Sequence, residues 1–271
     1  MKFYLSTIAD VDFAWNDDTQ TETITYVHRT GPVAAENGLG LELAEFCIAE
    51  NCAHPEKVSS FFRENLSYSK DLILHAPYNE LLPHAIEPAV AAVAEMRYRE
   101  AYALCEKFGL QKMVVHGNFN PLLYYPEWFI DRNIKFWKKF LAENKGNCII
   151  VLENVMESYP ALITEIIKGV DDPRFRMCLD IGHANLHPVA PEVWLEECAP
   201  YVSHLHIHNN KGPVPGNFAA AGDLHSALGN GDIDMEKLLK RAAEINPDMT
   251  ASLESNEIED SVNWLKERGF I

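Results

Sequence analysis

Residues 148–153 are Cys-Ile-Ile-Val-Leu-Glu, a short apolar run of strand length that ends in a carboxylate. Short apolar runs bounded by polar segments are typical of strands buried inside a protein. Such runs recur along the whole chain at intervals of roughly 25 to 45 residues, the repeat of a βα unit. The eight runs are Phe3–Ile8, Gly38–Phe46, Leu72–Ala76, Lys112–His116, Cys148–Glu153, Met177–Asp180, Val202–His208 and Thr250–Glu254.

The segments between these runs have the periodicity of amphipathic helices. Ala89–Phe108 is the clearest helix, and Ile130, Ile134 and Trp137 follow helical spacing in another segment. Uninterrupted alternation of strands and helices predicts the α/β class, with residues 1–271 forming a single closed (β/α)8 TIM barrel. An open, doubly wound sheet is the alternative.

The composition is that of an ordinary globular protein, with 47% hydrophobic and 23% charged residues among 271. The six cysteines are scattered without a CxxC pair, so we expect reduced core thiols and a cytoplasmic location. The first strand-like run starts at Phe3, which leaves no room for a signal peptide, and no apolar stretch reaches membrane-spanning length. The formal net charge of −17 discourages polyanionic partners.

Polar residues gather at the ends of the apolar runs. Because the carboxyl ends of all strands in a barrel converge on one face, we expect these side chains to surround one pocket. A further pair, Asp223 and His225, lies in a long loop whose flanking glycines, Gly222 and Gly229, let the backbone turn over the barrel mouth. The strand-end residues are His75, His116, Glu153, Asp180, His183, His206 and Glu254.

The alternation of side chains along the run Val202–His208 supports this placement. His204, His206 and His208 share one face, with Leu205 and Ile207 on the other. The aliphatic pair should face the helices and the histidines the barrel interior. We expect His204, one layer deeper than His206, to be a hydrogen-bonded core residue. For His208 the sequence allows two roles, support of a ligand residue or contact with the substrate.

A cluster of four carboxylates and five imidazoles needs compensating charge. Two carboxylates about 5 Å apart repel each other by roughly 3 kcal/mol at an effective dielectric constant of 20, and bound divalent cations remove that penalty. Mixed nitrogen and oxygen ligands suit zinc best, then manganese, iron or cobalt. The sequence therefore predicts a divalent-metal site for one to three ions, most simply zinc.

Several strings in this order are similar to those of the xylose isomerase-like superfamily, which includes endonuclease IV and the sugar isomerases and epimerases. The similarity covers about three-quarters of the chain, from the third run to the eighth, and is loose over the first 70 residues. The strings are His75-Ala76-Pro77-Tyr78, Val114-Val115-His116-Gly117, Leu152-Glu153-Asn154, Cys178-Leu179-Asp180-Ile181-Gly182-His183-Ala184, Leu205-His206-Ile207-His208-Asn209-Asn210, Asp223-Leu224-His225 and Leu253-Glu254.

The resemblance implies roles for these residues. All nine positions that hold the trinuclear zinc site of endonuclease IV have a matching residue type here. The set of ligands shared with the sugar epimerases is smaller: Glu153, Asp180, His206 and Glu254. In such epimerases Glu153 and Glu254 would exchange a substrate proton as general base and acid. There His183 would contact the substrate instead of a metal.

Other polar residues have weaker assignments. Tyr78, His208, Lys211 and Trp15 are candidate substrate contacts. Glu42, which alternates toward the interior of the second run, is either a structural hydrogen-bonding group or a site residue. We expect purely structural roles for the remaining histidines, namely His28, His54, His84 and His187, and a solvated helix face for Lys135, Lys138 and Lys139.

Charge on the loops distinguishes two chemistries. A protein that grips DNA presents Lys and Arg to phosphates, but the loops after the third to eighth runs contain hardly any besides Lys211. Aromatic residues are common in these loops and in the loop after the first run, and they suit the C–H faces of a sugar. They are Phe13, Trp15, Tyr78, Phe119, Tyr124, Tyr125, Trp128 and Phe218.

The charge pattern favours a metal-dependent isomerase or epimerase of a small sugar or cyclitol, with no nucleic-acid or membrane partner. The alternative is a zinc-dependent endonuclease that is similar to endonuclease IV and hydrolyses DNA at abasic sites. A metal-binding barrel without activity is the second alternative. The sequence leaves the substrate, the metal count and the oligomeric state open.

Overall fold

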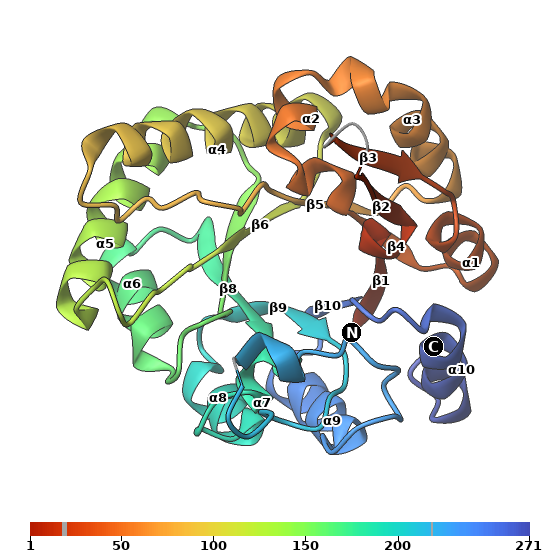
Figure 1. Cartoon of the computed structure of the whole chain (residues 1–271). Helices are drawn as coiled ribbons and strands as arrows, with labels where there is room; N and C mark the ends of the chain where they lie inside the picture. Colours follow the sequence, from red (N-terminus) through yellow and green to blue (C-terminus); the bar gives the residue numbers. More distant parts are fainter. Residues whose placement is uncertain (18–20, 218) are drawn as a thin grey trace.

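The computed structural model describes residues 1–17, 21–217 and 219–271, and their parallel strands form a closed barrel surrounded by helices (Figure 1). β1 pairs with β10 on one side and with β4 on the other, so the sheet has no open edge and the doubly wound alternative is wrong. Going round the barrel, the strands are β1 (Lys2–Ser6), β10 (Thr250–Leu253), β9 (Val202–Ile207), β8 (Phe175–Asp180), β7 (Ile149–Glu153), β6 (Lys112–His116), β5 (Leu72–His75) and β4 (Gly40–Leu43).

The helices lie on the outside of the barrel, between consecutive strands. In the described part of the chain they are α1 (Thr30–Asn37), α2 (Ala49–Ala53), α3 (Ser59–Tyr68), α4 (Pro88–Phe108), α5 (Pro126–Glu143), α6 (Ala161–Val170), α7 (Ile181–Asn185), α8 (Pro191–Cys198), α9 (Met235–Ile245) and α10 (Ile258–Glu267). The expected helix at residues 89–108 is confirmed as α4. It begins at Pro88, whose fixed φ suits a first helical turn, and ends at Phe108, where Gly109 caps it with φ 67°.

Barrel strands bury both faces, and the predicted alternation of side chains is confirmed. One small apolar cluster fills the barrel interior and contains Val114, Val151 and Cys178. Leu205 and Ile207 belong to the larger core between strands and helices, while His204 and His206, which alternate with them, point inward to Glu42. All six cysteines are buried and free, as expected of core thiols. None of the described helices is both long and apolar enough to cross a membrane.

The segment after β1 differs from the expected loop. It contains an antiparallel hairpin of β2 (Val11–Asn16) and β3 (Thr21–Tyr26), whose register pairs Val11 with Tyr26. The first two predicted strands also end early, because a 3₁₀ turn follows each of them: η1 (Thr7–Asp10) after β1 and η2 (Ala44–Cys47) after β4. These turns bring Ile8 and Ala44 to the mouth of the barrel, where both line its cavity.

Candidate functional site

A cavity of about 320 Å³ opens at the carboxyl ends of the barrel strands. Asp180 and His206 lie directly below it, fully buried, and both lie within 4 Å of other members of the cluster. The structure therefore brings all nine candidate ligands together. Those that line the cavity are His75, His116, Glu153, His183, Asp223, His225 and Glu254.

Glu153, at the end of β7, is the centre of the first group of side chains. Its Oε2 lies 3.3 Å from His116 Nε2 and 3.5 Å from His75 Nε2. The two imidazole nitrogens are 3.2 Å from each other. Three potential ligand atoms from β5, β6 and β7 therefore converge on one point, which is the arrangement that a metal ion requires.

The second group shares Glu153 and adds ligand atoms from β8, β9 and the end of β10. His206 Nδ1 lies 3.3 Å from Glu153 Oε2, 3.8 Å from Asp180 Oδ2 and 3.5 Å from Glu254 Oε2. One nitrogen thus faces three carboxylates in a fully buried position. Repulsion among those carboxylates makes the arrangement unfavourable unless positive charge lies between them.

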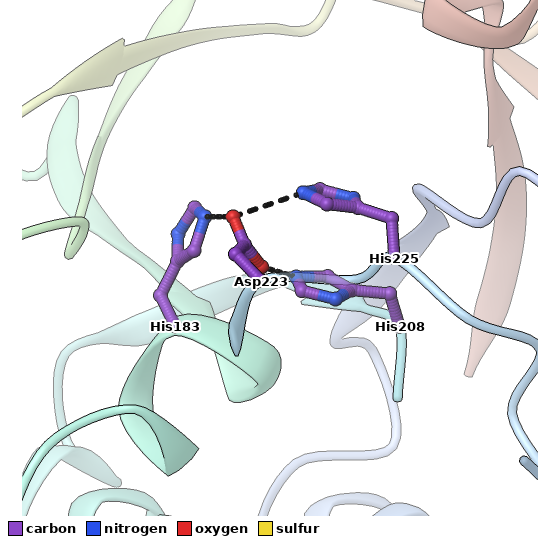
Figure 2. Close-up of side chains that lie close together, drawn as sticks. All are labelled: His183, His208, Asp223 and His225. Carbon is purple, nitrogen blue, oxygen red and sulfur yellow. Dashed lines mark hydrogen bonds and ion pairs between the residues drawn. The ribbon is translucent and has the colours of Figure 1, made fainter. Parts of the chain in front are cut away.

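The third group surrounds Asp223 and joins α7 to the loop after β9 (Figure 2). Asp223 Oδ2 lies 3.3 Å from His183 Nε2 and 3.2 Å from His225 Nε2. His208 Nε2 lies 3.7 Å from the other oxygen of Asp223, and its ring stacks on that of His225. Asp180 links this group to the second, because its Oδ1 lies 3.2 Å from His208 Nε2.

Three of the imidazoles are anchored in the same way. In each, Nδ1 contacts a backbone carbonyl, which can only accept, so Nδ1 carries the proton and Nε2 is presented to the cluster. This arrangement is typical of histidines that bind metal, because the second nitrogen fixes the tautomer and the ring orientation. The contacts are His75 with Ala76 O (3.0 Å), His183 with Asn154 O (3.1 Å) and His225 with Glu254 O (2.6 Å).

His206 is held by the opposite nitrogen. Its Nε2 lies 3.0 Å from Glu42 Oε1, so Nδ1 is the atom that faces the cluster. Glu42 Oε2 accepts from His204 Nε2 at 3.1 Å and contacts the hydroxyl of Ser252. Glu42, whose sequence allows a structural role or a site role, lies behind a candidate ligand and outside the cavity lining.

A chain of hydrogen bonds continues from Glu42 toward the amino-terminal ends of the barrel strands. His204 Nδ1 lies 2.6 Å from Thr250 Oγ1, which accepts from Lys112 Nζ at 2.6 Å. Lys112 also donates to the backbone oxygen of Ser203 at 2.7 Å. The expected role of His204 as a hydrogen-bonded core residue is confirmed.

Several buried ligand atoms of the cluster have no hydrogen-bond partner within residues 1–17, 21–217 and 219–271. They include Glu153 Oε2, Asp180 Oδ2, His206 Nδ1, Asp223 Oδ1 and both ring nitrogens of His208, and His206 Nε2 faces Glu42 Oε1 as an ion pair without a hydrogen bond. Buried polar atoms normally find a partner, and an unsatisfied one requires an explanation such as a bound ion. Carboxylate oxygens with imidazole nitrogens are a donor set for zinc, manganese, iron or cobalt, so these residues fit a divalent metal.

The electrostatics of the cluster also require positive charge. Burial acts to raise the pKa of Glu153, but the neighbouring His116 and His206 outweigh it and hold that pKa well below its usual range. Conversely, burial acts to lower the pKa of His225, and Asp223 with Glu254 raises it to about 9. Without metal, the carboxylates would thus hold protons on nearby imidazoles, and a divalent cation can replace those protons.

Residues 54–268 match the family model described as the xylose isomerase-like TIM barrel. That match spans most of the chain and contains all nine candidate ligands. The chain belongs to the xylose isomerase-like TIM barrel family.

Two relatives of this family member have different descriptions. An uncharacterised protein from Methanocaldococcus jannaschii is 26% identical over 228 residues, which is 80% of this chain and 75% of that protein. A probable endonuclease 4 from Mesomycoplasma hyopneumoniae strain J is 24% identical over 188 residues, or 63% of this chain and 64% of that protein.

Similar solved structures include sugar epimerases. A D-tagatose 3-epimerase-like protein has a TM-score of 0.77 and 23% identity, with 100% of this chain and 97% of that chain covered. A Thermus thermophilus protein soaked with ZnCl2 has a TM-score of 0.71 and 20% identity, at 100% and 98% coverage. A Methylomonas D-allulose 3-epimerase in complex with D-allulose has a TM-score of 0.70 and 12% identity, at 99% and 97%.

The four candidate substrate contacts of this xylose isomerase-like barrel have different positions. Tyr78 lines the cavity and stacks on His116, with ring centroids 4.2 Å apart. His208 is fully buried beneath the cavity and lies among the third group of ligand atoms. Lys211 is exposed and is not among the residues that line the cavity. Trp15 lies in β2, and its side chain is outside the described part of the structure.

The expected aromatic rim is largely wrong. Of the described aromatic side chains on these loops, only Tyr78 lines the cavity. Phe119 is buried against Phe129, and Tyr124 packs on His84. Phe13 and Tyr125 are exposed away from the lining, Trp128 donates its N–H to the carbonyl of His84, and Phe218 lies outside the described residues.

Proposed function

We propose that this chain is a divalent-metal-dependent isomerase or epimerase that acts on a small neutral sugar or cyclitol. The observation that carries the metal dependence is the convergence of unsatisfied buried carboxylate and imidazole atoms at the barrel mouth. The D-allulose and D-tagatose complexes among the similar structures support the choice of a sugar.

The size and charge of the cavity support a small neutral substrate. A volume of about 320 Å³ is at the lower end of the range for small-molecule pockets, about 300–1,000 Å³. Among the described residues that line it there is no Lys or Arg, so a phosphate group would find no cationic side chain there. The polar groups that remain are suited to hydroxyl and carbonyl groups.

We assign the proton transfer to Glu153 and Glu254, from β7 and from the end of β10. A bound divalent cation would polarise a substrate carbonyl and so acidify the adjacent C–H. Both carboxylates line the cavity and both lie within 3.5 Å of His206 Nδ1, so both face the same point from different strands. One can accept the proton from carbon while the other returns one.

The walls of the cavity would orient the substrate. Tyr78 presents a half-buried ring beside His116, and its face suits the C–H groups of a sugar. His183, on the opposite side of the cluster, has Nε2 directed at Asp223. We propose that His183 binds metal when the third group is occupied and contacts substrate hydroxyls when it is not.

Exchange of a substrate hydrogen with deuterated water tests this function. The metal-loaded protein should catalyse exchange on one member of a panel of ketoses and inososes, followed by NMR. Glu153→Gln and Glu254→Gln keep the size of the side chain but remove the proton acceptor, and should lower the rate by about 10²- to 10⁴-fold. Glu127→Gln, at an exposed position of α5, is the matched control. Exchange that survives in both site variants contradicts the assignment.

A specific observation favours an endonuclease as the second candidate. The third group, around Asp223, goes beyond the four ligands that resemblance to the sugar epimerases implies, and one relative is a probable endonuclease 4. Robust metal-dependent incision of abasic DNA, with no exchange on any sugar, would reverse the ranking. Metal binding without either activity would leave the inactive metal-binding barrel.

A further inference from the structure

A second hollow adjoins the cavity on the side of β5, β6 and β7. This groove has a volume of about 440 Å³ and is formed by the loops that follow these strands. Tyr78 lines both the cavity and the groove, and Val155 of the cavity is followed directly by Met156 of the groove. A substituent on a substrate held in the cavity would therefore reach the groove by passing Tyr78.

The outer wall of the groove is apolar and open to solvent. Leu122 is 92% exposed, Leu123 is 64% exposed and Met156 is 42% exposed. Neighbouring exposed apolar side chains beside a pocket mark a binding surface. Among the described residues that line this groove none is Lys or Arg and the one charged side chain is the exposed Glu80, so the wall formed by Leu122, Leu123 and Met156 is its apolar part.

Hydrogen bonds hold the groove in shape without a ligand. Asn120 accepts the backbone N–H of Leu122 with its side chain and those of Leu123 and Tyr124 with its carbonyl. Asn118 donates its side-chain N–H to the carbonyl of Tyr78 at 3.0 Å, which ties the loop after β6 to the loop after β5. A wall fixed in this way loses little entropy when it binds a partner.

Another hollow beside the cavity carries more charged side chains than the groove. It adjoins the cavity at Asn256 and is lined by charged side chains, among them Arg29, Glu257, Glu259 and Asp260. An apolar substituent would be unfavourable there because it would cover charged groups. The two hollows therefore direct an apolar extension of the substrate to the groove beside Tyr78.

We propose that this groove binds an apolar or aromatic aglycone, so that the substrate is a glycoside with a ketone on its sugar ring, which a bound metal can polarise, instead of a free monosaccharide. This inference rests on the proposed function, because it takes the sugar to lie in the cavity. The sugar ring would occupy the cavity, and the aglycone would lie along Leu122 and Met156.

Calorimetry with two glycosides tests the groove. Phenyl β-D-glucoside should bind the metal-loaded protein about tenfold more tightly than methyl β-D-glucoside, a ratio that corresponds to about 55 Å² of apolar surface removed from water. Leu122→Ser combined with Met156→Ser should remove this preference and leave the affinity for the methyl glucoside unchanged. Met96→Ser, a 45% exposed position of α4 outside both linings, is the matched control and should keep the preference.

Three results would overturn the proposal: equal affinities, a preference that survives the double variant, or no binding of either glycoside. Conversion of a wild-type dimer into a monomer by the double variant would also overturn it, because the groove would then be an interface between copies. Deuterium exchange on free ketoses separates the two proposals. If the protein exchanges deuterium into a ketose but does not prefer the phenyl glucoside, only the proposed role of the groove is refuted. If it prefers the phenyl glucoside but catalyses no exchange, only the proposed function is refuted.

Discussion

His204 and His206 lie two residues apart on β9, both point into the barrel, and both are fully buried. Both ring nitrogens of His204 have hydrogen-bond partners, Thr250 on one side and Glu42 with Ser252 on the other. His206 presents Nδ1 to three carboxylates without a hydrogen bond in the described structure. The same residue type on the same face therefore serves two purposes.

The difference separates two layers of the barrel interior. The lower layer, from Oε2 of Glu42 to Lys112, is a chain of hydrogen bonds in which each group contacts the next, whereas Oε1 of Glu42 faces the upper layer. The upper layer, around Glu153 and Asp180, retains unsatisfied acceptors. Saturated polar groups contribute to the folded state by themselves, whereas the upper layer is complete only with added cations. Four predictions test this contrast.

The largest effect should appear in folding, at His204. His204→Ala leaves the buried carboxylate of Glu42 without one partner, and we expect the free energy of unfolding of the metal-free protein to fall by about 3–5 kcal/mol. His206→Ala should also destabilise the metal-free protein, because Glu42 and three other carboxylates lose a neighbouring imidazole, but it should in addition abolish the stabilisation by metal that His204→Ala retains. Urea denaturation with chelator and with added zinc measures both effects. A His206→Ala protein that metal stabilises as much as it stabilises His204→Ala would remove the distinction between the layers.

Asp180→Ala should have the next largest effect, on metal binding. Wild-type protein at a free metal concentration about 100 times its dissociation constant should gain about 2.7 kcal/mol of stability. The variant should lose this increment, because Asp180 faces both His206 and His208. Thermal unfolding with and without zinc or manganese, together with elemental analysis, provides the measurement. Asp248→Ala, at an exposed position, is the control, and unchanged metal content in Asp180→Ala would contradict the site.

Glu42→Gln tests the contact between the two layers. Glu42 holds Nε2 of His206, so we expect the variant to weaken metal binding by about 10- to 100-fold, the usual consequence of losing a group behind a ligand. Ser252→Ala removes another contact of Glu42 but none of His206, and should change the affinity far less. Competition with a chromophoric chelator gives both constants. A Glu42→Gln protein that binds metal as tightly as the wild type would show that the contact with Glu42 is not needed to orient His206.

The smallest effect concerns pH and Lys112. Burial lowers the pKa of Lys112 to about 8, against about 10.4 in an unfolded chain. Between these values the unfolded state binds more protons, so this residue makes stability rise with pH, by no more than about 1.4 kcal/mol per unit. Relative to Lys112→Met, the wild type should gain about 1 kcal/mol between about pH 8 and pH 9. A pH-independent difference would show that the pKa is not lowered.

The eight barrel strands could be predicted because each is a short apolar run, and period-two alternation indicated the inward face of β9. The hairpin was missed because β2 and β3 are not apolar runs. The alternation of Thr23 and Thr25 with Ile24 and Tyr26 in β3 was nevertheless a strand signal. Such a pairing is local and exposed, so a search for buried runs does not detect it.

The candidate ligands could be located from sequence because the carboxyl ends of barrel strands must converge. Which nitrogen each imidazole presents could not be predicted. The partner of His206 is Glu42, far away in the chain, and their contact depends on how β4 and β9 face each other across the barrel. The packing of Phe119 and Tyr124 into the core likewise depends on loop conformation, which composition does not specify.

Asp223 and His225 belong to the irregular segment that follows β9, whereas Glu153, Asp180 and His206 belong to barrel strands. A cation held between the two sets would cross-link that segment to the barrel. Occupancy would then control access of a protease to the backbone beyond Asn210. Limited digestion could thus report metal loading even for a protein whose substrate has not been found. A first cleavage in the segment beyond Asn210 would indicate that the third group holds no metal.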